Sequence, residues 1–188
     1  VGYIALGFAI GNFYGIAGAV FHILSHAFMK TGLFYTSAAF KYRYGIHYTD
    51  RLGQVYRKMP VTCGALVVLA LSMIGLPPFA GFFGKWYLAL GAIQNGQYLY
   101  VAVLIISSLL SAIYFFRIFE KMFMGEKTVS EPAAPEEYYG YGKLTGKTEV
   151  PLQMLIPIVS AALMIIALGL GNSFIVNGIL RTTIMEVL

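Results

Sequence analysis

The stretch IAGAVFHILSHAFMKTGLFYTSAAF (16–40) is apolar enough and long enough to cross a membrane, yet it holds His22, His26 and Lys30. These three residues are spaced four positions apart, and an α-helix places such residues on one face. Ionisable side chains within a membrane are costly and usually serve the movement of ions or protons. The stretch therefore predicts a transmembrane helix and indicates a transport function.

The composition of the whole chain also favours a membrane protein. Of its 188 residues, 59% are hydrophobic and 11% are charged, and the mean hydropathy is +0.74. A soluble domain carries about 25% charged residues, so an ordinary soluble surface is excluded. The net charge of +5 is spread without a basic run, so no nucleic acid is expected as a partner. The single cysteine, Cys63, excludes an internal disulfide and is expected to be a small buried apolar residue.

The apolar segments predict an all-α, polytopic transmembrane helix bundle. Residues 1–12 would rise only about 18 Å as a helix, so we expect them to be the second half of a span that begins outside the chain. The region 1–121 is expected to form the helical core. Polar residues 122–150 predict a surface loop, and 151–188 a last transmembrane helix with an amphipathic tail. The expected core helices, besides the partial helix 1–12, cover about 16–40, 60–76, 79–95 and 97–119.

The stretch GLPPFAGFFGKWYLAL (75–90) predicts an interrupted helix. Pro77 and Pro78 lack backbone donors, while apolar sequence continues on both sides. Broken backbone in a bilayer is tolerated only where protein or a water-filled cavity covers it, and interrupted helices recur at transporter ion sites. We therefore expect one discontinuous helix over about 77–95. Lys85 lies either at an ion site beside the interruption or at the membrane interface next to Trp86.

The ionisable residues suit proton movement. Burial penalises the charged forms of lysine and histidine, so such groups can gain and lose protons near neutral pH. Waters would have to bridge the one-turn gaps between them. If the two helices pack together, a cation arriving at Lys85 would disfavour a proton on Lys30 by charge repulsion.

The polar residues in the spans allow three other interpretations. His22 and His26 form a pair that on a helix could bind zinc, but no nearby acid or cysteine completes the site and Lys30 would repel a cation, so no metal site is expected. The histidines could instead be hydrogen-bonded between packed helices. The segment 97–119 contains three serines, which are expected to allow close helix packing: Ser107, Ser108 and Ser111.

Two motifs in combination resemble a known family. HILSHAFMKTGLF (22–34) together with LSMIGLPPFAGFFGKWYLAL (71–90) is similar to the antiporter-like subunits of respiratory complex I. The same family includes the large subunits of Mrp-type cation/proton antiporters and of membrane-bound hydrogenases. The resemblance covers residues 1–121, whereas 122–188 matches only as a loop plus a last helix. It implies two inverted repeats, each with a broken helix, of which this chain would supply the second half.

The resemblance also implies roles for the ionisable residues. Lys30 matches the central proton-carrying lysine, His22 and His26 match the histidines that relay protons towards it, and Lys85 matches the lysine on the broken helix that gates exchange with one side. The implied function is proton translocation, with coupling to sodium left open, through a buried His/Lys relay. The alternative is a structural subunit or scaffold without an ion path of its own.

The resemblance further implies a setting for the chain. Expected partners are the lipid bilayer and other membrane subunits of a complex I-like, hydrogenase or Mrp-type assembly in a prokaryotic cell membrane. No cofactor and no catalytic redox chemistry are expected in this chain, because quinone or flavin would belong to neighbouring subunits. The first half of the family fold is not in the sequence, so the chain is either part of a longer polypeptide or a split subunit.

Overall fold

The computed structural model of the protein describes residues 1–125 and 149–180, and in these ranges every regular element is helical. The prediction of an all-α fold is thus confirmed. Short 3₁₀ turns at Thr49–Arg51 and Val55–Arg57 interrupt the loop after the second helix, and a π-helical turn covers Phe174–Leu180. The α-helices are α1 (Gly2–Ile10), α2 (Phe13–Tyr44), α3 (Pro60–Ile74), α4 (Ala80–Gln94), α5 (Tyr98–Met124) and α6 (Leu152–Leu170).

The helix with the ionisable residues, α2, is the centre of the bundle. Its 32 residues correspond to about 48 Å, longer than the expected span 16–40. The side chain of Asn12 caps its first turn by accepting a hydrogen bond from the Gly15 amide at 2.8 Å, and Gly45 ends it with a φ of 62°. Helices α1, α3, α4 and α6 all pack against α2. The central helix therefore contacts both halves of the interrupted segment.

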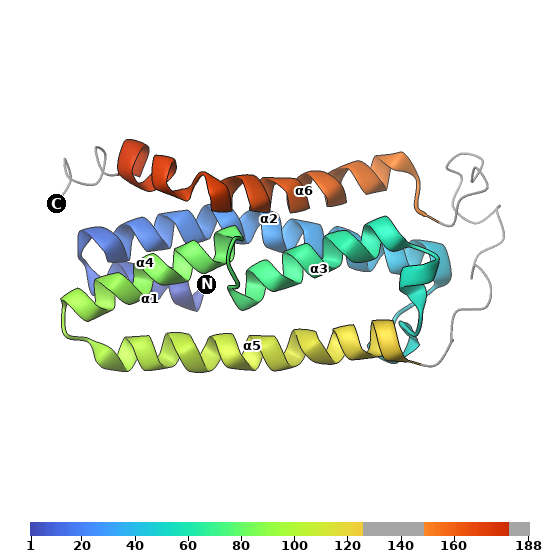
Figure 1. Cartoon of the computed structure of the whole chain (residues 1–188), viewed down its shortest axis with the longest axis horizontal. Helices are drawn as coiled ribbons and strands as arrows, with labels where there is room; N and C mark the ends of the chain where they lie inside the picture. The colour runs from blue at the N-terminus through green and yellow to red at the C-terminus, as the bar shows by residue number, and fades with distance from the viewer. Residues whose placement is uncertain (126–148, 181–188) are drawn as a thin grey trace.

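Helices α3 and α4 form one discontinuous path along α2 (Figure 1). Gly91 packs against Gly15 and Gly84 against His22, whereas α3 reaches the later part of α2, where Leu69 meets Gly32. Both short helices therefore run antiparallel to α2, α4 along its first half and α3 along its second. Figure 1 shows them in succession between α2 and α5.

The bounds of the discontinuous helix need a correction. We expected a separate span over 60–76 followed by a broken helix over about 77–95, but the break lies between α3 and α4 and α4 itself is continuous. Each of the two has 15 residues, or about 22 Å, which is too short for a hydrocarbon core of about 30 Å. The two segments are therefore halves of one crossing over 60–94.

The local sequence explains where this crossing is interrupted. Gly75 ends α3 with a φ of 93°, a conformation that favours glycine, and Pro77 and Pro78 cannot continue the hydrogen-bond ladder. The Ser72 hydroxyl then accepts a hydrogen bond from the Gly81 amide at 3.0 Å, in the first turn of α4. A Cβ atom at Gly81 would lie 1.9 Å from the Ser72 carbonyl oxygen. The break thus depends on close backbone contact between the two halves.

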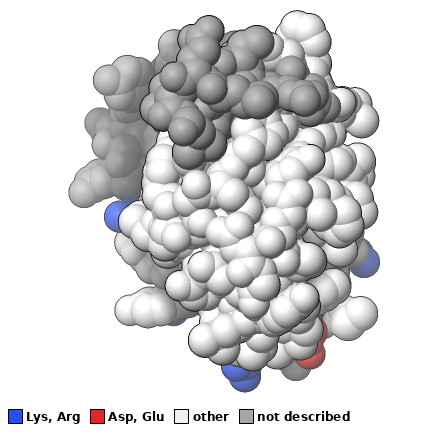
Figure 2. Space-filling model, turned by 90° about the vertical axis from the view of Figure 1, so that its left-hand side faces the viewer, with Lys and Arg blue, Asp and Glu red and all other residues white. Residues whose placement is uncertain are grey.

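Helices α5 and α6 provide the outer faces of the bundle. Within the described ranges, these two are long and apolar enough to cross a membrane. Helix α5 packs on α3 and α4, and α6 packs on α2, α3 and α4. Much of α5 is left uncovered, and its exposed side chains include Leu99, Ile105 and Leu109. The described surface seen from one end of the bundle is mostly uncharged, with scattered charged residues near its rim (Figure 2).

The expected loop and tail are only partly described. Of the loop 122–150, residues 126–148 lie outside the described residues, as do residues 181–188 of the tail. At the far end of the loop, the Glu149 carboxylate accepts hydrogen bonds from the Val61 amide at 2.7 Å and from the Thr62 hydroxyl at 2.6 Å. Glu149 therefore caps the N-terminus of α3, where free amides and the helix dipole favour a negative charge.

Candidate functional site

The amine of Lys85 lies at the helix break. It donates hydrogen bonds to the carbonyl oxygens of Met73 at 3.0 Å and Ile74 at 2.9 Å, and to the Ser108 hydroxyl at 3.0 Å. The two carbonyls belong to the last turn of α3, where they lack helical partners and carry the negative end of the helix dipole. A lysine has three donors, so all of them are used here. These contacts hold the Lys85 amine at the interruption.

The two histidines form a neighbouring pair on α2, with their rings tilted by 40° to each other. His22 is 3% exposed and His26 is half-buried, and their ring centroids are 5.6 Å apart. The His22 imidazole packs against Gly84, the neighbour of Lys85 in the sequence. Its Nδ1 atom has no hydrogen-bond partner among the described residues. An unpartnered buried nitrogen is uncommon and fits a group that exchanges a proton or binds water.

Tyr3 connects the lysine with the histidine pair. Its ring centroid lies 5.2 Å from the Lys85 Nζ atom and 5.3 Å from the centroid of the His22 ring, with an angle of 83° between the two rings. The Tyr3 hydroxyl is 2.7 Å from the Ser107 Oγ atom. Side chains from α1, α2, α4 and α5 therefore meet at one point inside the bundle.

Sequence reasoning missed Tyr3 and part of the role of the serines. We assigned Ser107 and Ser108 to helix packing, but Ser108 binds the Lys85 amine and Ser107 binds the Tyr3 hydroxyl. The signal for the serines was two adjacent hydroxyls within an otherwise apolar helix. For Tyr3 the sequence gives no such signal, because its partners come from three other helices.

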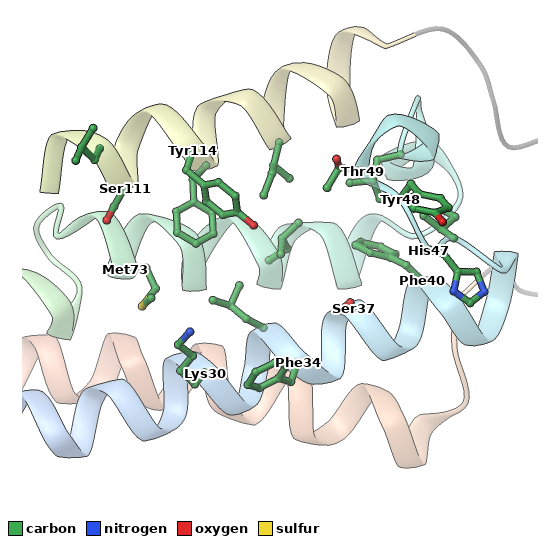
Figure 3. Close-up of a pocket in the computed structure, with 17 residues that line it drawn as sticks. Lys30, Phe34, Ser37, Phe40, His47, Tyr48, Thr49, Met73, Ser111 and Tyr114 are labelled. Atoms are coloured by element: carbon green, nitrogen blue, oxygen red, sulfur yellow. The ribbon is translucent and has the colours of Figure 1, made fainter. Parts of the chain in front are cut away.

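Lys30 lies apart from this cluster and faces a cavity. The cavity has a volume of about 590 Å³ and lies between α2, α3, α5 and the loop that follows α2 (Figure 3). Lys30 is exposed, and its amine is 5.9 Å from the centroid of the Phe34 ring. Side chains of α5, including Tyr114, point into the cavity from the wall opposite Lys30. The polar residues that line the cavity are Lys30, Ser37, His47, Tyr48, Thr49, Ser111 and Tyr114.

The four residues singled out in the sequence thus fall into two groups. His22 and Lys85 lie together at the break with His26 beside His22, and Lys30 is one turn further along α2, at the cavity. In the described part of the chain, no three His, Cys, Asp or Glu residues lie close enough to hold a metal ion. The arrangement consists of titratable nitrogens in succession, which can pass protons between neighbours through waters.

Comparisons with known proteins identify the family of the chain. Residues 1–111 match the family described as NADH:quinone oxidoreductase/Mrp antiporter, TM. The chain is 42% identical over 182 residues to NADH-quinone oxidoreductase subunit N of Desulforudis audaxviator, covering 96% of this chain and 36% of that protein. It is 36% identical over 131 residues to the antiporter subunit mnhD2 of Staphylococcus aureus, covering 70% of this chain and 26% of that protein.

A solved structure shows the same fold. A chain of the Mrp complex from a Dietzia species superimposes with a TM-score of 0.78 at 26% identity, over 93% of this chain and 38% of that one. The chain thus spans about a third of the length of the Desulforudis and Dietzia proteins. Because the family match covers more than half of its residues, the chain belongs to the transmembrane family shared by NADH:quinone oxidoreductases and Mrp antiporters.

Proposed function

We propose that the chain forms part of a proton path across a membrane, with Lys85, His22, His26 and Lys30 as the groups that carry the proton. One observation supports this most directly. A row of titratable side chains on α2 begins beside a lysine held at a break in the neighbouring crossing and continues to an open cavity. Interrupted helices with freed carbonyls are a recurring feature of ion sites in transporters.

In this proposal the cavity supplies the route between Lys30 and water. The lining includes hydroxyls on two sides, from Ser37 of α2 and from Ser111 and Tyr114 of α5, and His47 lies in the loop beyond the helix end. Polar walls of this kind can hold waters that bridge donor and acceptor groups. In this proposal, a proton exchanges between the loop side and Lys30 through the cavity. It then passes along the histidines towards Lys85.

The proposal includes a setting within a larger membrane assembly. Relatives carry the names of a quinone oxidoreductase subunit and an antiporter subunit, and the superimposed chain comes from an Mrp complex. The uncovered apolar face of α5 needs lipid or another membrane helix against it. We therefore expect other membrane subunits as partners and a prokaryotic cell membrane as the location. In this proposal the path carries protons, either alone or in exchange for sodium.

Alanine substitutions at the two lysines test the proposal in the complete assembly. Lys85→Ala and Lys30→Ala are compared with Lys41→Ala, which changes an exposed lysine near the end of the same helix α2. Acidification of inside-out membrane vesicles is followed with a pH-sensitive dye, and the amount of assembly is measured on native gels. We expect both site variants to lose transport per assembled complex by about 10²-fold or more, because a proton-transfer group is removed. Lys41→Ala should transport normally.

The outcomes separate transport from a scaffold role. Loss of transport with the assembly retained supports a proton path. Loss of the assembly itself in both variants would favour a structural subunit. Normal transport in both variants, at normal amounts of assembly, would overturn the proposal.

A further inference from the structure

Tyr3 contacts both Lys85 and His22 through its ring. The Lys85 amine is 5.2 Å from the ring centroid and the His22 ring is 5.3 Å from it. A cation near the face of a tyrosine is attracted by the electrons of the ring. An edge-to-face pair of aromatic rings is also a favourable geometry. The tyrosine therefore stabilises the present position of both groups.

The hydroxyl of Tyr3 fixes the orientation of that ring. The Ser107 Oγ atom lies 2.7 Å from the Val103 carbonyl oxygen of its own helix, to which it can donate. It also lies 2.7 Å from the Tyr3 hydroxyl, and either oxygen can be the donor in that hydrogen bond. Because Ser108 binds the Lys85 amine, adjacent serines of α5 hold the tyrosine and the lysine in register.

We propose that Tyr3 is a positioning residue for proton exchange, whose ring holds the Lys85 amine at the helix break and keeps it from joining His22 through water. This inference rests on the proposed proton path. The three donors of the amine are directed to Met73, Ile74 and Ser108, so in this arrangement none is directed to the imidazole. The His22 Nδ1 atom is without a partner in the described part of the chain, so a water reaching it would complete a connection.

The consequence concerns uncontrolled proton flow. With the ring in place, the lysine has to leave the α3 carbonyls before it can exchange a proton with the histidine. Without the ring, water can occupy the vacated volume, take one amine proton from the hydrogen bond to Ser108, and connect the amine with His22. Removing the ring should therefore let protons pass when nothing drives transport.

Three single variants in the complete assembly test this inference. Tyr3→Leu removes the ring but keeps an apolar side chain, Tyr3→Phe keeps the ring and removes its hydroxyl, and Ser107→Ala removes the same hydrogen bond from the other side. Passive proton conductance is measured in vesicles after a pH jump without any driving reaction. We expect Tyr3→Leu to raise it about tenfold, a change that corresponds to about 1.4 kcal/mol in the barrier.

The hydroxyl variants sharpen the test through a double-mutant cycle. Tyr3→Phe and Ser107→Ala should raise passive conductance by the same smaller factor, and the double variant should add nothing, because both remove one bond. Passive conductance at the wild-type level in Tyr3→Leu would overturn the inference. If Tyr3→Leu does not assemble, wild-type conductance in both Tyr3→Phe and Ser107→Ala would overturn it.

The lysine variant distinguishes this failure from failure of the proposed function. If Lys85→Ala loses transport while Tyr3→Leu conducts like the wild type, the proton path stands and only the role of Tyr3 is refuted. If Lys85→Ala transports normally, the path itself fails.

Discussion

Two lysines of this bundle occupy opposite kinds of surroundings. Lys85 is partly buried at the break, and its three donors bind two helix carbonyls and a serine. Lys30 is exposed to a cavity of about 590 Å³, and its Nζ atom lies 5.9 Å from the centroid of the Phe34 ring. The first lysine lies in a closed region, which comprises the break, Tyr3 and the two histidines. The second lies in an open region, which is the cavity between α2, α3 and α5.

The two halves of α2 differ in how closely their neighbours pack against them. The first half of α2 is packed tightly against α4 by glycines such as Gly18 and Gly84. The second half loosens where α5 is separated from it by the cavity (Figure 3). Close packing fixes distances between titratable groups, whereas an open wall admits water. In the proposed path, the closed region would control passage and the open region would supply protons.

The largest expected effect concerns the stability of the closed region. Lys85→Ala should lower the stability of the assembly by about 3 kcal/mol, because two carbonyls at the end of α3 lose a charged donor. Lys30→Ala should change stability little, since the lysine faces an open cavity. Thermal unfolding of the purified assemblies in detergent measures both. Equal stability of the two variants would show that Lys85 stabilises the fold no more than Lys30 does.

A second prediction tests the packing at the break. Gly81→Ala should destabilise the fold by about 2 kcal/mol, because its Cβ atom would lie 1.9 Å from the Ser72 carbonyl oxygen and the backbone must shift. Gly64→Ala is the matched control on α3, since nothing lies within 4 Å of its Cβ position. Helix propensity predicts that this control is neutral or slightly stabilising. The same thermal measurement applies, and a harmless Gly81→Ala would contradict tight packing.

A third prediction measures water access along α2. In a Cys63→Ala background, Ser37→Cys at the cavity should react with a small water-soluble thiol reagent about tenfold faster than Ser25→Cys, because exposure limits thiol reactivity. Ser25 is fully buried and Ser37 is exposed, although both belong to α2. Reaction rates followed by mass spectrometry give the ratio. Equal rates would show that the closed region admits water as freely as the cavity does.

The smallest expected effect concerns the other end of α3. Glu149→Gln should lower stability by about 1 kcal/mol, because a neutral amide caps a helix N-terminus less well than a carboxylate. The loss should be smaller than that of Lys85→Ala, since this end of α3 is more exposed. Thermal unfolding again reports the change. A stability loss in Glu149→Gln that exceeds the loss in Lys85→Ala would show that the N-terminal cap of α3 contributes more than the C-terminal one.

Much of the fold followed from the sequence because hydropathy and helix breakers act locally. The apolar runs predicted the helices, and Pro77 and Pro78 predicted the interruption. Local signals could not show that α3 and α4 share one crossing. A 15-residue apolar segment reads the same whether it is a short span or half of a longer one. Only packing along α2, from Gly91 against Gly15 to Leu69 against Gly32, distinguishes the two.

The site was predicted in part for the same reason. Helical spacing alone placed His22, His26 and Lys30 on one helix face, because they belong to one element. Contacts between elements were out of reach, so the serine and carbonyl partners of Lys85 and the contact of Tyr3 with both groups came only from the structure. The proton-carrying roles of these residues stay predictions.

Side chains of opposite charge lie at the two ends of α3 and compensate its helix dipole. Glu149 meets the positive end of this helix and Lys85 meets the negative end, so the helix dipole is compensated inside the bundle. When the amine leaves, two unpaired carbonyl oxygens remain at the break, and water is the smallest donor that can replace it. Displacement of one side chain would thus wet the closed region from within.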